Sequence, residues 1–423
     1  MDVSTAFNYT SYYLFPLFAS PSNVQIHSIR TIPFTNNPPL NTPSNAPYKE
    51  RISLKPYNTF GIDVTADYWV EIFHLDDIAR LLGTDLYRQY PHFILGGGSN
   101  VLFPGDYHGL IIKNSIPGVT VISEDECHVV VRTGAGVVWD DLVRHCLNNG
   151  WGGLENLSMI PGLTGAAPIQ NIGAYGVELK ETFVSLDAVQ LDNGQTESFD
   201  RERCQFSYRD SIFKRSCKGR YLITSVTLKL DKKPKMNISY GPLKAMLSEK
   251  GVDQPTIQDV SRAVRAVRSY KLPDPSITGN AGSFFKNPLV TGDRFAQLQD
   301  SYPDIPGYPV VDQSDSTGGD ITASGGKITP SGGKITSSGG RSPSSSVKIP
   351  AAWLIEKCGF KGMRDGDAGV HKRHALILVN HGRASGEQLL GLARNIRETV
   401  LEKFGIALEP EVNIVNGDIG IKP

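Results

Sequence analysis

The segment at 158–175, SMIPGLTGAAPIQNIGAY, restricts the fold of this chain more than any other part of the sequence. Its interspersed glycines and prolines suit a backbone that folds tightly against a flat, polar ligand, because glycine adopts positive φ and lets a main chain approach closely. Gln170 and Asn171 each add donors and acceptors to such a surface. A cluster of this kind is by itself more often an ordinary turn, so a ligand-binding loop requires a second element elsewhere.

That second element lies upstream, in HFILGGGSNVLF at 92–103. The apolar residues before the glycines predict a strand, and the glycines follow at its end. Successive backbone amides at such a turn form a concavity that binds anions, here a diphosphate, and Ser99 and Asn100 add side-chain partners. The spacing matches neither the dinucleotide fingerprint nor the P-loop.

A third element, at 131–157, predicts a strand, a turn and a helix that flank the loop. The turn is Gly134-Ala135-Gly136, and apolar residues then recur at helical spacing. These positions are Val138, Leu142, Val143 and Leu147.

Seven segments occur in the order seen in one enzyme family: GGGSN, TGAG, IPGLTGAAPIQNIGAYG, FSYRDSIFK, YKLPDP, GNAGSFFKNP and LEPEV. On these motifs the chain resembles the UDP-N-acetylenolpyruvoylglucosamine reductases, the MurB flavoenzymes. The resemblance runs from about residue 58 to residue 412, apart from one insertion. The ISYGPL segment around Tyr240 is similar to the longer (type I) subtype of that family.

The resemblance implies an α+β fold whose first two subdomains bind FAD in the manner of vanillyl-alcohol oxidase relatives. We expect these subdomains at 48–116 and 117–272. A substrate-binding domain follows at 273–423, with its C-terminal segment returning to the active site. The implied reaction uses NADPH to reduce FAD, and reduced FAD then converts UDP-N-acetylglucosamine enolpyruvate to UDP-N-acetylmuramate, a peptidoglycan precursor.

Three catalytic residues follow from the resemblance: Arg209, Ser283 and Glu411. The matching arginine faces the enolpyruvyl carboxylate, for which a planar guanidinium gives a bidentate grip. The matching serine donates the proton after hydride transfer, and the glutamate holds or polarises the enolpyruvyl group. Taken alone, each has an ordinary structural reading: a surface ion pair, a turn residue and a solvated charge. Tyr208-Arg209-Asp210 lies in a strand-like context.

The resemblance also implies binding residues for cofactor and substrate. FAD would contact Gly97, Gly98, Ser99, Asn100, Ile160, Gly165, Ala166, Gln170, Asn171 and Gly173. The UDP-sugar would contact Tyr175, Tyr240, Lys271 and Asn287. The chain departs from the family at Asn413, where several members carry arginine, and at Ala166, where some carry serine. Both departures predict weaker FAD retention at most.

Charge and cysteine content exclude several other classes of protein. Lysine and arginine total 43, as do aspartate and glutamate, so the net charge is zero and nothing points to nucleic acid or to an anionic membrane. The five cysteines are odd in number and widely spaced, which favours free thiols over a disulfide framework or a zinc site. We expect no metal, and a monomer.

Two segments differ from the rest of the chain. Residues 1–47 contain one acidic and one basic residue and are rich in Ser, Thr, Asn and Pro, which suits either a disordered extension or a cleaved organellar signal. The protein is otherwise expected in the cytoplasm. Three seven-residue copies, ITASGGK, ITPSGGK and ITSSGGR, occupy 321–341 and predict a low-complexity surface insertion at 312–347.

Two other functions stay open from the sequence. One is an FAD-dependent oxidase or dehydrogenase of the same fold that acts on another small molecule, because a fold does not determine a substrate. The other is a catalytically idle scaffold, which the N-terminal extension and the repeats suggest.

Overall fold

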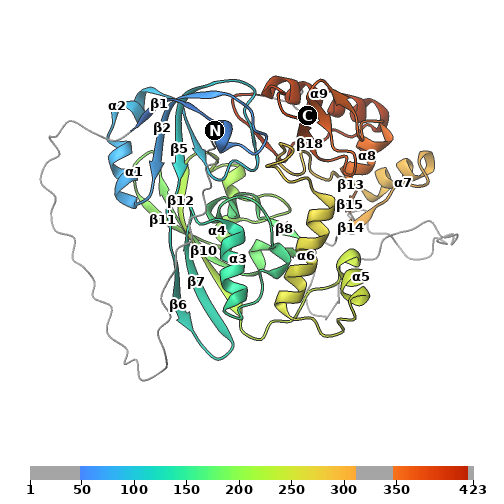
Figure 1. Ribbon diagram of the computed structural model, residues 1–423, viewed down its shortest axis with the longest axis horizontal. Coiled ribbons are helices and arrows are strands. Elements are labelled where there is room, and N and C mark those ends of the chain that lie inside the picture. Colours follow the sequence, from blue (N-terminus) through green and yellow to red (C-terminus); the bar gives the residue numbers. More distant parts are fainter. Residues whose placement is uncertain (1–47, 311–345, 418–423) are drawn as a thin grey trace, which may run out of the picture. The chain divides into compact units, whose positions relative to one another are not determined.

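The structure, a computed structural model, describes residues 48–310 and 346–417 (Figure 1). The extension at 1–47 and the three repeats at 321–341 lie outside these residues. Of the expected insertion only Ser346 and Val347 are described, and both belong to a paired strand. Within the described part of the chain, no helix is long and apolar enough to cross a membrane.

The N-terminal sheet has the strand order β1-β2-β5-β3. β1 is antiparallel to β2, whereas β2, β5 and β3 run parallel. Leu110, Ile111 and Ile112 of β5 are all fully buried, as expected for a parallel strand covered on both faces. The elements of this region are β1 (Lys49–Ser53), β2 (Thr65–Ile72), α1 (Leu75–Leu82), α2 (Asp85–Gln89), β3 (His92–Leu95) and β5 (Tyr107–Asn114). The strand predicted before the glycines is therefore confirmed as β3.

A second, five-stranded antiparallel sheet has the order β11-β10-β12-β7-β6. Its elements are β6 (Val119–Glu124), β7 (His128–Gly134), α3 (Trp139–Asn148), β10 (Phe183–Gln190), β11 (Thr196–Asp200), α4 (Arg201–Cys204) and β12 (Tyr221–Asp231). α3 covers one face of this sheet and shares a hydrophobic core with β7, β10 and β12 (Figure 1). The predicted strand-turn-helix is confirmed, with one correction: Val138 precedes the helix and is 45% exposed.

The loop at 158–175 folds as two short 3-10 turns, Thr164–Ala166 and Pro168–Gln170, and packs directly against its neighbours. A Cβ added at Gly165 would lie 2.5 Å from the Cβ of Ala135, and one at Gly97 would lie 2.9 Å from the Cα of Gly162. Side chains at these glycines would force the segments apart. The GGGSN turn and the loop are therefore in backbone contact.

The turn after β3 leads into β4 (Val101–Leu102), which pairs in parallel with β19 (Asn413–Ile414). This pairing brings Glu411, near the end of the described chain, next to Asn100. Asn100 Nδ2 donates to the Glu411 carbonyl at 3.2 Å and to Gln170 Oε1 at 2.9 Å. One side chain thus connects three segments that are far apart in the sequence.

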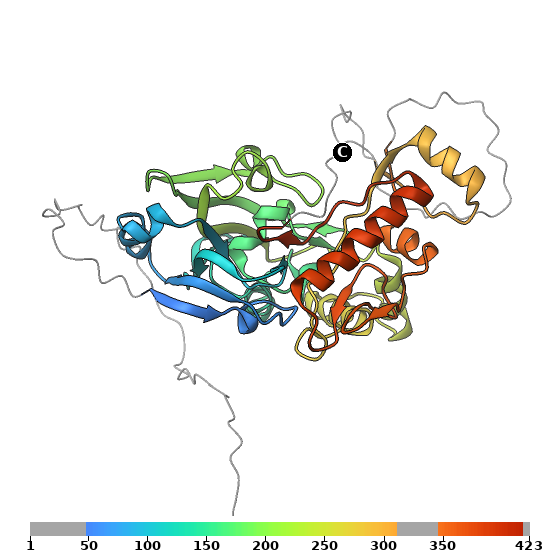
Figure 2. The same cartoon turned by 90° about the horizontal axis from the view of Figure 1, so that it is seen from above.

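The remaining elements begin with α5 (Gly241–Glu249) and α6 (Ile257–Lys271), then continue with β13 (Leu289–Thr291), α7 (Gly292–Ser301), β14 (Tyr308–Val310), β15 (Ser346–Lys348), α8 (Ala351–Lys357), β16 (Arg364–Asp365), β17 (Ala368–Val370), β18 (Leu378–Asn380) and α9 (Gly386–Phe404). The long helix α9 packs on β17, β18 and α8, as Figure 2 shows. Its residues share one hydrophobic core with residues of the N-terminal sheet, such as Trp69 of β2 and Ile111 of β5. Contacts join the described residues, 48–310 and 346–417, into one compact unit, and the three-subdomain boundaries stay a prediction.

Replacing Gly98 by alanine is expected to lower the free energy of unfolding by about 3 kcal/mol. Gly98 has a φ of +66°, and a Cβ there would lie 1.9 Å from the Tyr57 carbonyl oxygen. Gly105→Ala is the matched control, since nothing lies within 4 Å of its added Cβ. Urea unfolding of both variants is the measurement. Equal stability of the two variants would show that the turn relaxes without cost.

Candidate active site

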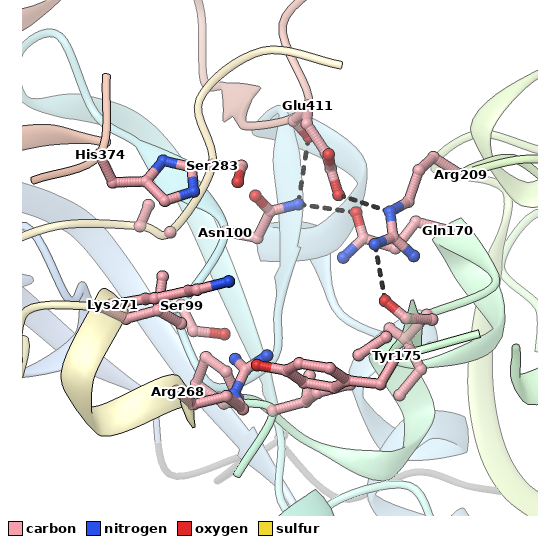
Figure 3. Close-up of a pocket in the computed structure, with 18 of the residues that line it drawn as sticks. Ser99, Asn100, Gln170, Tyr175, Arg209, Arg268, Lys271, Ser283, His374 and Glu411 are labelled. Atoms are coloured by element: carbon pink, nitrogen blue, oxygen red, sulfur yellow. Dashed lines mark hydrogen bonds and ion pairs between the residues drawn. The ribbon is translucent and has the colours of Figure 1, made fainter. Parts of the chain in front are cut away.

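A cavity of about 320 Å³ brings together most of the side chains singled out in the sequence, and on that ground it is the main cavity of the candidate site (Figure 3). Eleven of the predicted residues line it: Ser99, Asn100, Ile160, Gln170, Gly173, Tyr175, Arg209, Tyr240, Lys271, Ser283 and Glu411. They come from the GGGSN turn, the 158–175 loop, the turn around Arg209, the residue before α5, the end of α6, the segment around Ser283 and the C-terminal segment. The two neighbouring cavities described below are lined by fewer of the predicted residues.

Arg209 lies in a tight turn, and this corrects the strand-like context expected from the sequence. Its φ is +54°, a left-handed conformation, and Ser207 and Asp210 form an isolated bridge around it. Nη2 donates to the Gly173 carbonyl at 2.6 Å. Nε lies 3.2 Å from Glu411 Oε1, without the alignment of a hydrogen bond. The turn therefore aims the guanidinium at both the loop and the C-terminal segment.

Glu411 extends from the C-terminal segment toward the Arg209 guanidinium (Figure 3). Its backbone amide donates to the Phe284 carbonyl at 2.8 Å, and its carbonyl accepts from Asn100. Burial raises the pKa of the Glu411 carboxyl, while Arg209, Lys214 and Lys286 oppose that shift. The carboxylate therefore depends on nearby cations for its charged form.

Ser283 is held by well-packed neighbours on both sides. Gly282 before it has a φ of +71°, and Phe284 after it is fully buried. The Phe284 amide donates to the Leu376 carbonyl at 2.8 Å, which fixes this strand-like segment to the chain near His374. Figure 3 shows the His374 ring beside the Ser283 hydroxyl. Burial, with a contribution from Lys271, lowers the pKa of His374, so its imidazole is neutral near pH 7.

A cluster of aromatic and cationic side chains forms the other end of the main cavity. The Tyr175 and Tyr240 rings meet edge to face with centroids 5.1 Å apart, and Lys271 Nζ lies 5.6 Å from the Tyr240 ring. Arg268 is buried next to Tyr175, and its Nε has no hydrogen-bond partner within the described ranges. Three cations, Arg209, Arg268 and Lys271, thus face a cavity that contains one carboxylate. Such a lining favours an anionic ligand.

A narrower cleft, the glycine cleft, continues from the main cavity between residues 96–101 and 160–163 and has a volume of about 110 Å³. It opens into an aromatic cavity of about 220 Å³ that is lined in part by Phe93, Phe213 and Tyr221. In the described residues no hydrogen bond uses the backbone amides of residues 97–100, so these donors remain for a ligand. The free amides, the narrow cleft and the adjoining aromatic cavity fit an extended dinucleotide such as FAD.

Four more of the predicted cofactor residues border the two smaller cavities, and two of these also have a structural role. Gly97, Gly98 and Ala166 border the glycine cleft, and Gly165 borders the aromatic cavity. The amides of Gly165 and Ala166 are bonded to the Ala135 and Leu163 carbonyls, so these two residues shape the loop and have no free amide.

Asn171 and Asn287 border none of these cavities. The fully buried Asn171 side chain donates to Glu178 and Ser207 and accepts from the Lys180 amide, which holds the loop. Asn287 accepts from the Ala351 amide at the start of α8. Their predicted ligand contacts stay a prediction, and the roles that their hydrogen bonds indicate are structural.

Sequence reasoning did not single out Arg268, His374 or Lys214 as site residues. The sequence could have indicated Arg268, because it precedes Lys271 by three residues and therefore lies on the same face of α6. No pattern in the sequence indicates His374, because the pairing of residues 283 and 377 is what places it in the cavity. Lys214 lies within the FSYRDSIFK motif but attracted no role.

Comparisons with known proteins agree with this architecture. Two family models match: an FAD binding domain over residues 67–200, and the C-terminal domain of UDP-N-acetylenolpyruvoylglucosamine reductase over residues 274–415. The structure of UDP-N-acetylenolpyruvylglucosamine reductase (MurB) from Thermus caldophilus is similar, with a TM-score of 0.54 at 23% identity over 86% of this chain and 98% of that one. The predicted α+β fold, with an FAD-binding part and a C-terminal domain, is confirmed.

Curated relatives extend the similarity over most of the sequence. The chain is 46% identical over 365 residues to the UDP-N-acetylenolpyruvoylglucosamine reductase of Chromobacterium violaceum, which corresponds to 86% of this chain and 98% of that protein. It is 44% identical over 366 residues to the Pseudomonas aeruginosa enzyme, with the same coverage. The chain belongs to the UDP-N-acetylenolpyruvoylglucosamine reductase family.

Proposed function

We propose that this protein is an FAD-dependent oxidoreductase that uses NADPH to reduce UDP-N-acetylglucosamine enolpyruvate to UDP-N-acetylmuramate, a step of peptidoglycan precursor synthesis. The observation that carries the proposal is the meeting of Arg209, Ser283 and Glu411 in one cavity that adjoins the glycine cleft. The similarity over almost the full length of named reductases supports it.

The glycine cleft and the aromatic cavity would hold FAD, through the amides of residues 97–100 and the side chains of Ser99, Asn100 and Gln170. FAD bound there would supply the hydride-transfer chemistry between NADPH and the substrate double bond. The protein's part is to bind, to orient and to supply charge and a proton.

Arg209 would bind the enolpyruvyl carboxylate through its planar guanidinium. Negative charge moves toward that carboxylate as hydride adds to the double bond, and a fixed cation stabilises this charge most at that moment. Glu411 holds the guanidinium from the other side at 3.2 Å. The substrate carboxylate would approach the guanidinium from the cavity, where Gly173 already fixes one amino group.

Ser283 would donate the proton to the carbon that carries the developing negative charge. An alcohol is a weak acid, so its oxygen requires stabilisation as the proton leaves. Lys271 faces the same cavity, and the neutral His374 imidazole lies beside the hydroxyl in Figure 3. Tyr240 and Lys271, together with Tyr175 and the buried Arg268, would bind the substrate diphosphate at the cationic end.

A coupled assay tests this function. Protein reconstituted with FAD is expected to oxidise NADPH over many turnovers only when the enolpyruvyl substrate is present, since without it each flavin is reduced once, and mass spectrometry should find the UDP-N-acetylmuramate product. Flavin retention with turnover of some other small molecule would support the oxidase or dehydrogenase alternative. A protein that neither binds FAD nor oxidises NADPH would be the idle scaffold. Cytoplasmic location, organellar targeting by residues 1–47 and the monomeric state stay predictions, which fractionation and gel filtration test.

A further inference from the structure

Lys214 is a buried cation to which the proposed reaction assigns no part. Its Nζ has almost no contact with solvent and, among the residues that the structure describes, no hydrogen-bond partner. An ammonium group carries three donors and loses its hydration when it is buried. A buried charge without an acceptor is unfavourable, so a group that supplies one would stabilise this arrangement.

The position of Lys214 is rigidly set by its neighbours. It ends the 3-10 turn Ile212–Lys214, which packs against the Pro168–Gln170 turn of the loop. The Ser211 hydroxyl donates to the Ile169 carbonyl at 2.7 Å, and the buried Phe213 ring packs between Phe199 and Tyr221. These contacts fix the backbone from which the Lys214 side chain extends, and its Nζ lies at a site with almost no solvent contact.

The side chain borders the glycine cleft, the aromatic cavity and a third cavity along residues 410–414. It therefore lies where the cleft with its free amides passes into the space lined by Phe93 and Tyr221. Nearby acidic groups do not neutralise it fully. Burial lowers the pKa of Lys214 and Lys286 adds to this, while Glu411 and Asp210 act in the opposite direction without bonding to it.

We propose that Lys214 binds the diphosphate of FAD, together with the amides of residues 97–100. This assignment rests on the proposed function, since it takes FAD as the ligand of the cleft. A dinucleotide that extends through both cavities has its anionic centre between its two ring systems, and Lys214 lies at the junction of the two cavities. The cation would also offset the absence of an arginine at Asn413, which borders the same cleft.

Flavin titration of the purified apoprotein tests the assignment, with Lys214→Met as the variant. We expect this variant to lose affinity for FAD and for ADP by about 10- to 100-fold, as for loss of a charge-assisted hydrogen bond. Affinity for riboflavin, which has no phosphate, should stay within about twofold. Quenching of flavin fluorescence reports FAD and riboflavin, and competition with FAD reports ADP. Lys218→Met is the matched control, because Lys218 is exposed at the rim of the same aromatic cavity.

Thermal unfolding of the apoprotein distinguishes a binding role from a structural one. Methionine removes an unpaired buried charge, so the melting temperature without ligand should stay equal or rise. Unchanged FAD affinity in Lys214→Met would overturn the proposal, as would equal losses for FAD and riboflavin, because the lysine would then contact the ring or only the fold. If the wild-type protein bound no flavin at all, the proposed function itself would fail.

Discussion

Replacement of Ser283 by alanine is expected to leave reduction of the flavin by NADPH at the wild-type rate and to slow its re-oxidation by the enolpyruvyl substrate. The expected loss is about 100- to 10,000-fold, the usual contribution of a positioned proton donor. Anaerobic stopped-flow absorbance at the flavin band separates the two half-reactions. Only the second requires a proton on substrate carbon, so only the second should depend on the hydroxyl.

The substitution should not disturb the fold, because the Ser283 hydroxyl makes no hydrogen bond within residues 48–310 and 346–417, and the backbone pairing at Phe284 is unaffected. Ser276→Ala is the matched control. Ser276 is exposed, and among the described residues its hydroxyl bonds to Asp274 alone, in the turn that follows α6. Equal slowing of both half-reactions in Ser283→Ala would remove Ser283 as the proton donor and indicate a role in positioning the flavin.

Replacement of Arg209 by methionine should have two separable effects. The first is on catalysis: re-oxidation by substrate should fall by about 100- to 1,000-fold, because the substrate carboxylate loses its cation. The second is on stability. Glu411 would be left buried without the cation at 3.2 Å, and breaking such a pair costs about 3 kcal/mol. Stopped-flow kinetics and urea unfolding measure the two effects independently.

The stability effect has a defined pH dependence. Burial already raises the pKa of Glu411 above its ordinary value of 4.5, and loss of Arg209 would raise it further. A raised pKa in the folded state contributes stability below the unfolded-state pKa, and this contribution is lost as the pH rises through the folded-state pKa. The deficit of Arg209→Met should therefore be small near pH 5 and grow toward pH 8.

A double variant separates charge burial from catalysis. Arg209→Met with Glu411→Gln removes both charges, so most of the lost stability should return while re-oxidation stays slow. A deficit of Arg209→Met that is as large at pH 5 as at pH 8 would show that packing, not the Glu411 charge, causes it. Recovery of re-oxidation in the double variant would contradict a direct role of the guanidinium.

Short patterns of apolar residues in the sequence predicted the strands and helices that those patterns determine. The apolar run before the glycines is β3, and the helical spacing of Leu142, Val143 and Leu147 gives the buried face of α3. Val138 fits the same spacing but lies before the first turn of the helix. Periodicity gives the face of a helix better than its first residue.

The geometry of the site could not be read from such patterns, because it depends on contacts between distant segments. Glu411 reaches the cavity through the pairing of β19 with β4 and through Asn100. Arg209 reaches it through a left-handed backbone conformation. The sequence does not predict this conformation, because residues other than glycine rarely adopt positive φ. The resemblance to a family supplied these residues as candidates.

Chemical character alone does not distinguish a ligand-binding residue from a structural one in the loop. Asn171 has the donors and acceptors of a ligand-binding residue, and its side-chain bonds to Glu178, Ser207 and Lys180 also hold the loop in place. Gly165 is a residue type that lets a backbone approach a ligand, but here the lack of a side chain allows the close contact with Ala135. Which of several polar or glycine residues faces a ligand is decided by packing that only coordinates reveal.

A crystal structure of the protein with FAD and the enolpyruvyl substrate would show directly whether the three side chains surround the reacting group. We expect the isoalloxazine ring at the junction of the glycine cleft and the main cavity, with Arg209, Ser283 and Glu411 around the enolpyruvyl group. Flavin bound elsewhere, or a substrate that contacts none of these three side chains, would contradict the account.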